Sequence, residues 1–273
     1  MGKFDGMLIC TDLDGTLFTS DKRVSDENIK AIEYFKSEGG FFTFVTGRMP
    51  FFASHVCEII HPNAPFGCIN GGGLYDNDAK KYIWTTEISK KVISLIESVE
   101  ESLPDIGIQV NLFDKIYFCR ENLTMEKFRR LTGVPNLTRS YLDIDEPMAK
   151  IVFGSESDRE IAELERVLRS HPEAGDFNFI RSERTLFEIL PKGSGKGRSI
   201  EMLCKHLGID RNKTVAVGDY SNDIPMFRAA RVGIAVSNAC EEALKAADFV
   251  TVSNDENAIA QVISDVESGR FGI

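Results

Sequence analysis

The sequence lacks the features of a membrane span, a disulfide framework and a soft-metal site. No apolar run approaches the length that crosses a bilayer. The six cysteines are scattered without a CxxC pair, so we expect free thiols. The histidines are also dispersed, at His55, His61, His171 and His206. A zinc centre would need a cluster of Cys or His ligands, and the sequence therefore argues against one.

Basic residues are in the minority, with 32 Lys and Arg against 42 Asp and Glu and a formal net charge of -10. Surfaces that bind nucleic acids or anionic membranes need clustered Lys and Arg. We therefore expect neither partner. A small anionic substrate is compatible with this charge, because local cations or a bound metal can reverse the field inside a cleft.

The N-terminal segment MGKFDGMLICTDLDGT has no extended apolar stretch before its acidic residues. It therefore does not read as a secretory signal, and we expect a cytoplasmic protein.

Short apolar runs alternate with amphipathic stretches near both ends of the chain. This alternation predicts an α/β fold, a doubly wound parallel sheet with helices on both faces. Ligands of such sheets bind at the carboxyl ends of the strands. The predicted strands are residues 7–11, 41–45, 66–70, 213–219, 232–236 and 248–252, and two predicted helices are 25–37 and 50–60.

The middle of the chain has a different pattern of predicted elements, in which several strand-like runs follow one another directly. This order favours antiparallel pairing, and about three helical patterns are interleaved with it. We predict an α+β domain at residues 83–190, inserted into a core made of 1–82 and 191–273. Residues 111–115 and 181–185 are candidate specificity loops, although solvated hairpin tips explain them equally well.

The sharpest motif is DLDGT, directly after the first predicted strand. Asp12 and Asp14 are two residues apart, so on an extended chain their carboxylates project to the same side. Two unpaired carboxylates at a buried strand end would be costly, and a cation is expected between them and a third acid. The alternative is an ordinary polar exit from the strand.

Two further motifs can supply phosphate ligands. Thr46 and Gly47 follow the second predicted strand, where a hydroxyl and a backbone amide can donate to a phosphoryl oxygen, although Thr46 could instead cap a helix. Lys196 opens a predicted helix and can direct its charge at a phosphate or a carboxylate. The segment around Lys196 is not a P-loop, because Leu190 and Gly197 replace residues that the P-loop requires.

The fourth motif, GDYSND, follows the strand at 213–219. Asp219 at the strand tip can complete a cage of oxygen ligands, whereas Asp223 could equally be a helix cap. All four motifs are predicted to meet at one edge of the sheet. Hard carboxylate ligands favour Mg²⁺ as the cofactor.

The set DLDGT, TGR, Lys196 and GDYSND, in this order, resembles the haloacid dehalogenase superfamily of phosphatases. The large insertion and the segment from Asn238 to Thr251 are similar to its Cof-type branch. The resemblance covers essentially the whole chain. It implies a Rossmann-like core, an inserted α/β cap that selects substrates, and hydrolysis of small phosphoesters such as sugar phosphates.

The resemblance also implies a role for each motif residue. Asp12 would be the nucleophile that forms an aspartyl-phosphate, and Asp14 the general acid and base. The phosphoryl group would be held by Thr46, Gly47, Lys196 and Asn222. Mg²⁺ would be bound by Asp12, the Asp14 carbonyl and Asp219, with Asp223 supporting the cage.

Two alternatives stay open. A sugar phosphomutase also uses two aspartates, and a non-catalytic metabolite sensor could keep the same scaffold. The presence of Asp14 favours phosphate esters over halides, because an alkoxide leaving group needs a proton. The sequence does not identify the physiological substrate or the oligomeric state.

Overall fold

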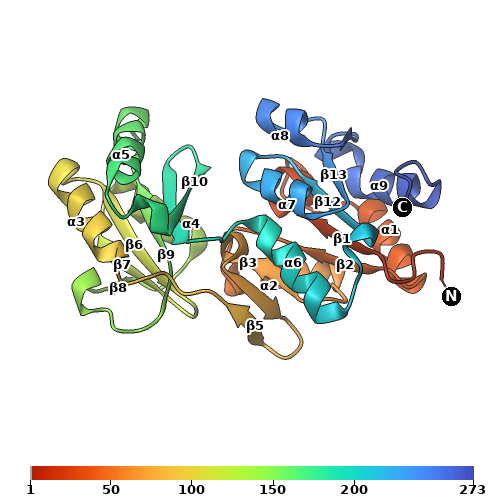
Figure 1. The fold of residues 1–273 in the computed structure, drawn as a ribbon, viewed down its shortest axis with the longest axis horizontal. Coiled ribbons are helices and arrows are strands. Elements are labelled where there is room, and N and C mark those ends of the chain that lie inside the picture. Colours follow the sequence, from red (N-terminus) through yellow and green to blue (C-terminus); the bar gives the residue numbers. More distant parts are fainter. Residues whose placement is uncertain (1) are drawn as a thin grey trace. The chain divides into compact units, whose positions relative to one another are not determined.

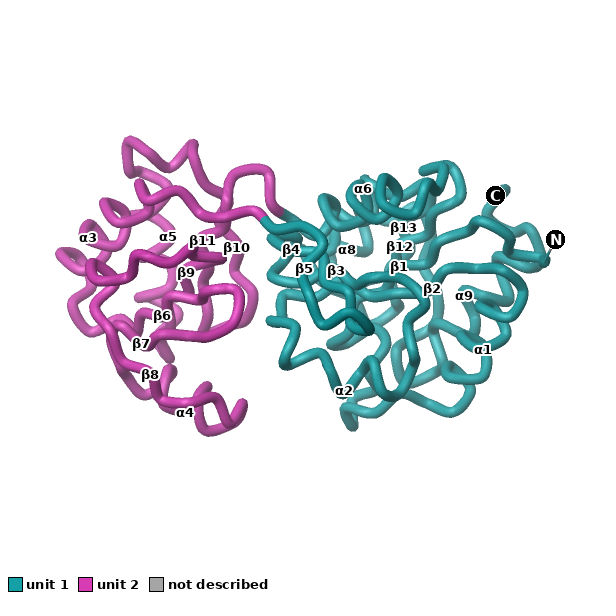
Figure 2. The backbone as a smooth tube through the Cα atoms, turned by 90° about the horizontal axis from the view of Figure 1, so that it is seen from below, with its two compact units in different colours: residues 1–85, 195–273 teal, residues 86–194 magenta. Residues whose placement is uncertain are grey.

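The computed structural model describes residues 2–273 and divides into two compact units (Figure 2). Unit 1 takes up the chain to Thr85 and again from Gly195 onward, and unit 2 is Thr86–Ser194. The sequence-based division was at 82 and 190. The first unit extends to Thr85 because β5 (Lys81–Thr85) pairs with β4 (Gly73–Asp76) in a hairpin.

Unit 1 is built on a five-stranded parallel sheet in the order β14-β13-β12-β1-β2 (Figure 1). The predicted α/β class with a doubly wound parallel sheet is confirmed. The strands are β1 (Leu8–Thr11), β2 (Phe41–Phe44), β12 (Thr214–Gly218), β13 (Val232–Ala235) and β14 (Phe249–Val250). The helices of this unit are α1 (Asp26–Ser37), α2 (Pro50–Ile60), α6 (Lys196–Leu207), α7 (Ile224–Ala229), α8 (Glu241–Ala246) and α9 (Ala258–Glu267).

Both faces of this sheet are covered. Leu8 and Cys10 of β1 belong to the hydrophobic cluster that contains Leu203 of α6 and Met226 of α7. Ile9 points to the opposite face because side chains alternate along a strand, and it is also fully buried. This two-sided burial explains why the strands read as continuous apolar runs.

One predicted strand lies outside the parallel sheet. The expected strand at 66–70 is β3 (Phe66–Cys68), and it pairs antiparallel with β4 in a small sheet of order β3-β4-β5. It contacts the parallel sheet beside β2, through an isolated bridge between Val45 and Gly67 and through the stacked rings of Phe44 and Phe66. After Cys68 the backbone leaves the extended conformation, so residues 69 and 70 are not part of the strand.

Unit 2 contains a six-stranded sheet in the order β10-β11-β9-β6-β7-β8, mostly antiparallel as predicted. α3 and α5 share a hydrophobic core with the central strands. Within the sheet, Lys150 and Glu188 form a buried ion pair at 2.8 Å. The elements are α3 (Val92–Ser102), β6 (Gly107–Leu112), β7 (Ile116–Arg120), α4 (Leu123–Thr132), β8 (Leu137–Thr138), β9 (Met148–Gly154), α5 (Asp158–Ser170), β10 (Phe177–Glu183) and β11 (Leu186–Pro191).

Candidate active site

The candidate site begins at the turn after β1. The backbone N–H of Asp12 still donates to the Val217 carbonyl at 2.8 Å, which holds Asp12 at the end of the sheet ladder. The chain then turns sharply through Leu13–Leu17, and Gly15 has a φ of 80°. A Cβ at position 15 would lie 2.5 Å from Oδ2 of Asp219. Glycine therefore allows this turn to approach the tip of β12.

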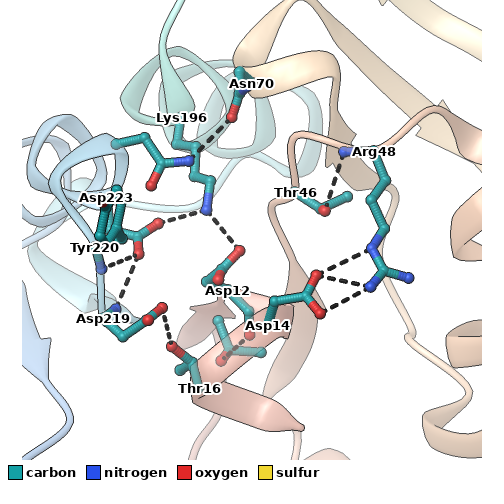
Figure 3. Close-up of polar contacts among 12 residues, drawn as sticks. Asp12, Asp14, Thr16, Thr46, Arg48, Asn70, Lys196, Asp219, Tyr220 and Asp223 are labelled. Atoms are coloured by element: carbon teal, nitrogen blue, oxygen red, sulfur yellow. Dashed lines mark hydrogen bonds and ion pairs between the residues drawn. The ribbon is translucent and has the colours of Figure 1, made fainter. Parts of the chain in front are cut away.

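Three carboxylates and one lysine meet at this edge of the sheet (Figure 3). Asp12, Asp219 and Asp223 each offer an oxygen within 4.8 Å of the others. Lys196, the first residue of α6, places Nζ 2.6 Å from Oδ1 of Asp12 and 2.6 Å from Oδ1 of Asp223. The structure thus brings together four residues from three sequence motifs.

The negative charge of this cluster exceeds its positive charge, since three carboxylates share one ammonium group. Burial raises the pKa of Asp12, and the neighbouring Asp223 and Asp219 raise it further against the opposing effect of Lys196. Burial also raises the pKa of Asp219, again with help from Asp223. Burial lowers the pKa of Lys196, but Asp12 and Asp223 outweigh it, so the lysine stays charged.

Hydrogen bonds hold two of these carboxylates in place. Oδ2 of Asp223 accepts from the backbone N–H groups of Asp219 at 2.9 Å and Tyr220 at 3.0 Å. The Asp223 carboxylate therefore caps this turn and also pairs with Lys196. A capping role and a role in support of the proposed metal cage are compatible. The Thr16 hydroxyl donates to Oδ1 of Asp219 at 3.1 Å.

The donor set fits a hard divalent cation. Carboxylate oxygens are the ligands that Mg²⁺ prefers, and the cluster carries more negative charge than Lys196 can balance. Burial and mutual repulsion raise the pKa values of Asp12 and Asp219, and a cation beside them would offset the repulsion.

The Asp14 carboxylate does not join this cluster. Arg48 donates to it through Nη2 at 2.8 Å and through Nε at 3.1 Å, and Lys22 donates at 3.0 Å. Burial raises the pKa of Asp14, but the two cations outweigh it and lower that pKa overall. The expectation that both carboxylates project to the same cation assumed an extended chain, whereas the backbone turns from Leu13 onward.

The predicted phosphate ligands lie around the same cluster. Thr46 follows β2 and is buried, and its hydroxyl accepts from the backbone N–H of Arg48 at 3.2 Å. It does not cap α2, since the N-cap of that helix is Met49. Asn222 donates through Nδ2 to Oδ1 of Asn70 at 3.3 Å.

Sequence reasoning did not assign a role to Arg48, Lys22 or Asn70. Arg48 stands within the recognised TGR motif, but its ion pair with Asp14 joins residues 34 positions apart. Asn70 is followed by three glycines, and an Asn-Gly pair after a strand is a signal for a left-handed turn. That signal could have directed attention to Asn70.

The parallel sheet with carboxylates at its strand ends makes unit 1 an α/β fold with a candidate metal site, and comparison with known proteins identifies the family. A family model for haloacid dehalogenase-like hydrolases matches residues 9–263. The chain belongs to this family. A crystal structure of a haloacid dehalogenase-like hydrolase from Bacteroides thetaiotaomicron superposes with a TM-score of 0.82 at 25% identity, covering 95% of this chain and 99% of that one.

Two curated relatives from Bacillus subtilis are named as phosphatases. The 5-amino-6-(5-phospho-D-ribitylamino)uracil phosphatase YwtE is 27% identical, covering 96% of this chain and 99% of its own length. The phosphatase YwpJ is 28% identical, covering 94% and 98%. Family and relatives together identify the chain as a phosphatase. Within residues 2–273, no helix is both long and apolar enough to cross a membrane.

Proposed function

We propose that this phosphatase depends on Mg²⁺ and hydrolyses phosphate esters of small polyhydroxylated metabolites, sugar phosphates among them, through an aspartyl-phosphate on Asp12. The observation that carries the proposal is the cluster of Asp12, Asp219 and Asp223, in which two buried carboxylates and one half-buried one share a single lysine. A structural ion pair would not need this excess of negative charge.

In the first proposed step, a carboxylate oxygen of Asp12 attacks phosphorus, the bond to the ester oxygen breaks, and Asp14 in its protonated form gives its proton to the departing alkoxide. Because Arg48 and Lys22 lower the pKa of Asp14 in this structure, we propose that Asp14 leaves these ion pairs before it acts as the acid. In the second step, Asp14 takes a proton from a water molecule, and the water oxygen attacks phosphorus. The bond between phosphorus and the Asp12 carboxylate breaks, which releases inorganic phosphate and regenerates Asp12. Lys196 holds Asp12 at 2.6 Å, and this contact orients the nucleophile.

The other site residues bind the transferred group. We propose that Thr46, Gly47, Lys196 and Asn222 hold the phosphoryl oxygens. Mg²⁺ would be held by Asp12, the Asp14 carbonyl and Asp219, with Asp223 fixing the loop around them. When bound, the cation would offset the repulsion between the Asp12 carboxylate and the phosphoryl group.

The substrate class has support from three relatives, which share the name of one phosphorylated substrate. YwtE is named for a substrate whose phosphate is carried by a ribityl chain, which is a polyol. We propose that unit 2 supplies substrate selectivity, as expected for an inserted cap. The candidate loops at 111–115 and 181–185 both lie at hairpins of its sheet, between β6 and β7 and between β10 and β11.

A panel of phosphorylated sugars, polyols, nucleotides and cofactors tests this function. We expect release of inorganic phosphate with Mg²⁺, no turnover in EDTA, and recovery when Mg²⁺ is added back. Full activity of metal-free protein, or recovery with zinc alone, would contradict the proposed cofactor. An isomerised sugar phosphate in place of free phosphate would identify a phosphomutase.

A further inference from the structure

The segment after β3 has an unusual backbone. Ile69, Asn70 and Gly71 are consecutive residues with positive φ values of 56°, 49° and 83°. A β-branched residue such as isoleucine rarely adopts this left-handed conformation, and the conformation costs energy. Such strain persists where the surrounding structure requires it, and it is concentrated at functional sites.

The strained segment directs a buried carboxamide toward the phosphate site. Asn70 is fully buried, and its backbone N–H donates to the Thr46 carbonyl at 3.1 Å. The backbone N–H of Ile69 donates to the Arg48 carbonyl at 3.1 Å. Two hydrogen bonds therefore tie the segment to the loop after β2.

The Asn70 carboxamide contacts two residues that we assign to phosphate binding. Nδ2 of Asn222 donates to Oδ1 of Asn70 at 3.3 Å. A Cβ at Gly47 would lie 2.9 Å from Nδ2 and 3.0 Å from Oδ1 of Asn70, so the carboxamide packs directly on the glycine. One side chain thus joins the loop after β2 to the loop after β12.

We propose that Asn70 is a positioning residue of the phosphate site. Its carboxamide orients the side chain of Asn222 and fixes the turn at Gly47, so that donors from two separate loops converge on one phosphoryl group. This inference rests on the proposed function of the site. The competing explanation is that Asn70 only stabilises the turn after β3.

The variant Asn70→Gly separates these explanations. Glycine accepts the left-handed backbone at position 70, so the fold should persist while the carboxamide is lost. We expect kcat/KM to fall about tenfold to a hundredfold, as for other residues that orient a site, and the affinity for inorganic phosphate to weaken with it. Phosphate affinity is measured by calorimetry and by competitive inhibition of aryl phosphate hydrolysis.

Asn257→Gly is the matched control. Asn257 also has a left-handed backbone, with a φ of 63°, and it precedes α9. The same exchange there should leave kcat/KM and phosphate affinity unchanged.

A double-mutant cycle tests whether Asn70 acts through Asn222. We expect Asn222→Ala to weaken phosphate binding, and Asn70→Gly to add little in its presence, because coupled residues are not additive. Losses that multiply in the double variant would overturn the proposed route through Asn222. Wild-type phosphate affinity and kcat/KM in Asn70→Gly would overturn the whole inference.

A second variant covers failure of Asn70→Gly to fold. Asn70→Ala also removes the carboxamide, adds no charge, and restricts the backbone more than glycine does. We expect the folded variant to bind phosphate more weakly than wild type, whereas a purely structural role predicts unchanged affinity. If the wild-type protein neither hydrolyses phosphoesters nor binds phosphate, the proposed function fails and this inference fails with it.

Discussion

Both units bury charged side chains in or beside their sheets, and the balance of charge differs between them. In unit 2, Lys150 on β9 faces Glu188 on β11 at 2.8 Å, and the pair is neutral. In unit 1, Lys196 lies 2.6 Å from both Asp12 and Asp223, and Asp219 is a third carboxylate of the same cluster.

This difference distinguishes the Lys150–Glu188 pair from the proposed metal site. A neutral buried pair compensates its own desolvation and needs no ligand. A buried cluster with excess negative charge is costly, and such a cluster is explained when a cation occupies it. The excess of negative charge in the unit 1 cluster is therefore a stronger indication of a metal site than the burial of its charged side chains.

The largest effect is expected from Asp12→Asn, which removes the nucleophile and one negative charge of the unbalanced cluster. Turnover should fall about 10⁴-fold or more, with the fold intact. Rapid acid quench and mass spectrometry of the Asp12 peptide should find no phosphoenzyme. Asp265→Asn is the control, since Asp265 is a buried aspartate of α9 that pairs with Arg270. A phosphoenzyme in the Asp12 variant would assign the nucleophile to another residue.

Asp14 is a carboxylate near the cluster that pairs with cations, and its substitution tests whether it has a different role from Asp12. Arg48 and Lys22 both pair with it, although it lies only two residues from Asp12. Asp14→Asn should slow turnover by about a hundredfold to ten-thousandfold through the loss of acid and base assistance. With an aryl phosphate, whose leaving group needs little protonation, phosphoenzyme should accumulate because water is no longer deprotonated. Stopped-flow and acid-quench measurements follow both steps, and an absence of accumulation would contradict this role.

The neutral pair of unit 2 should respond as a structural element. Lys150→Met removes the cation that pairs with the buried Glu188 carboxylate and should destabilise the protein by about 3–5 kcal/mol. The double variant Lys150→Met/Glu188→Leu should recover most of this loss, because no buried charge is left alone. Urea unfolding measures both variants. If the double variant is as unstable as the single one, an uncompensated buried charge does not explain the loss of stability.

The smallest effect concerns metal binding without catalysis. At a concentration about a hundredfold above its dissociation constant, Mg²⁺ should stabilise the folded protein by about 2.7 kcal/mol. Asp219→Asn should reduce this gain, since one carboxylate ligand is lost, whereas Asp265→Asn should retain it. Thermal unfolding with and without Mg²⁺ provides the comparison. An equal gain in the Asp219 variant would remove Asp219 from the metal site.

The strand pattern and the places of the polar motifs could be read from the sequence. Asp12, Thr46 and Asp219 each follow an apolar run, and each lies at the carboxyl end of a strand in the parallel sheet. This succeeded because strands buried on both faces are continuous apolar runs, and because parallel strands end at the same edge. Asp12 and Asp219 were accessible to sequence reasoning for the same reason, whereas Lys196 was found as the first residue of a predicted helix.

Only the tertiary structure decided which partners the polar groups take. Asp14 pairs with Arg48 and not with the cluster, because the chain turns after Asp12 and brings its carboxylate to a residue 34 positions away. Asn70 contacts Asn222 across 152 positions through a strained backbone. Periodicity reports burial along one element, whereas such contacts depend on the turn geometry and on how the loops after different strands pack together.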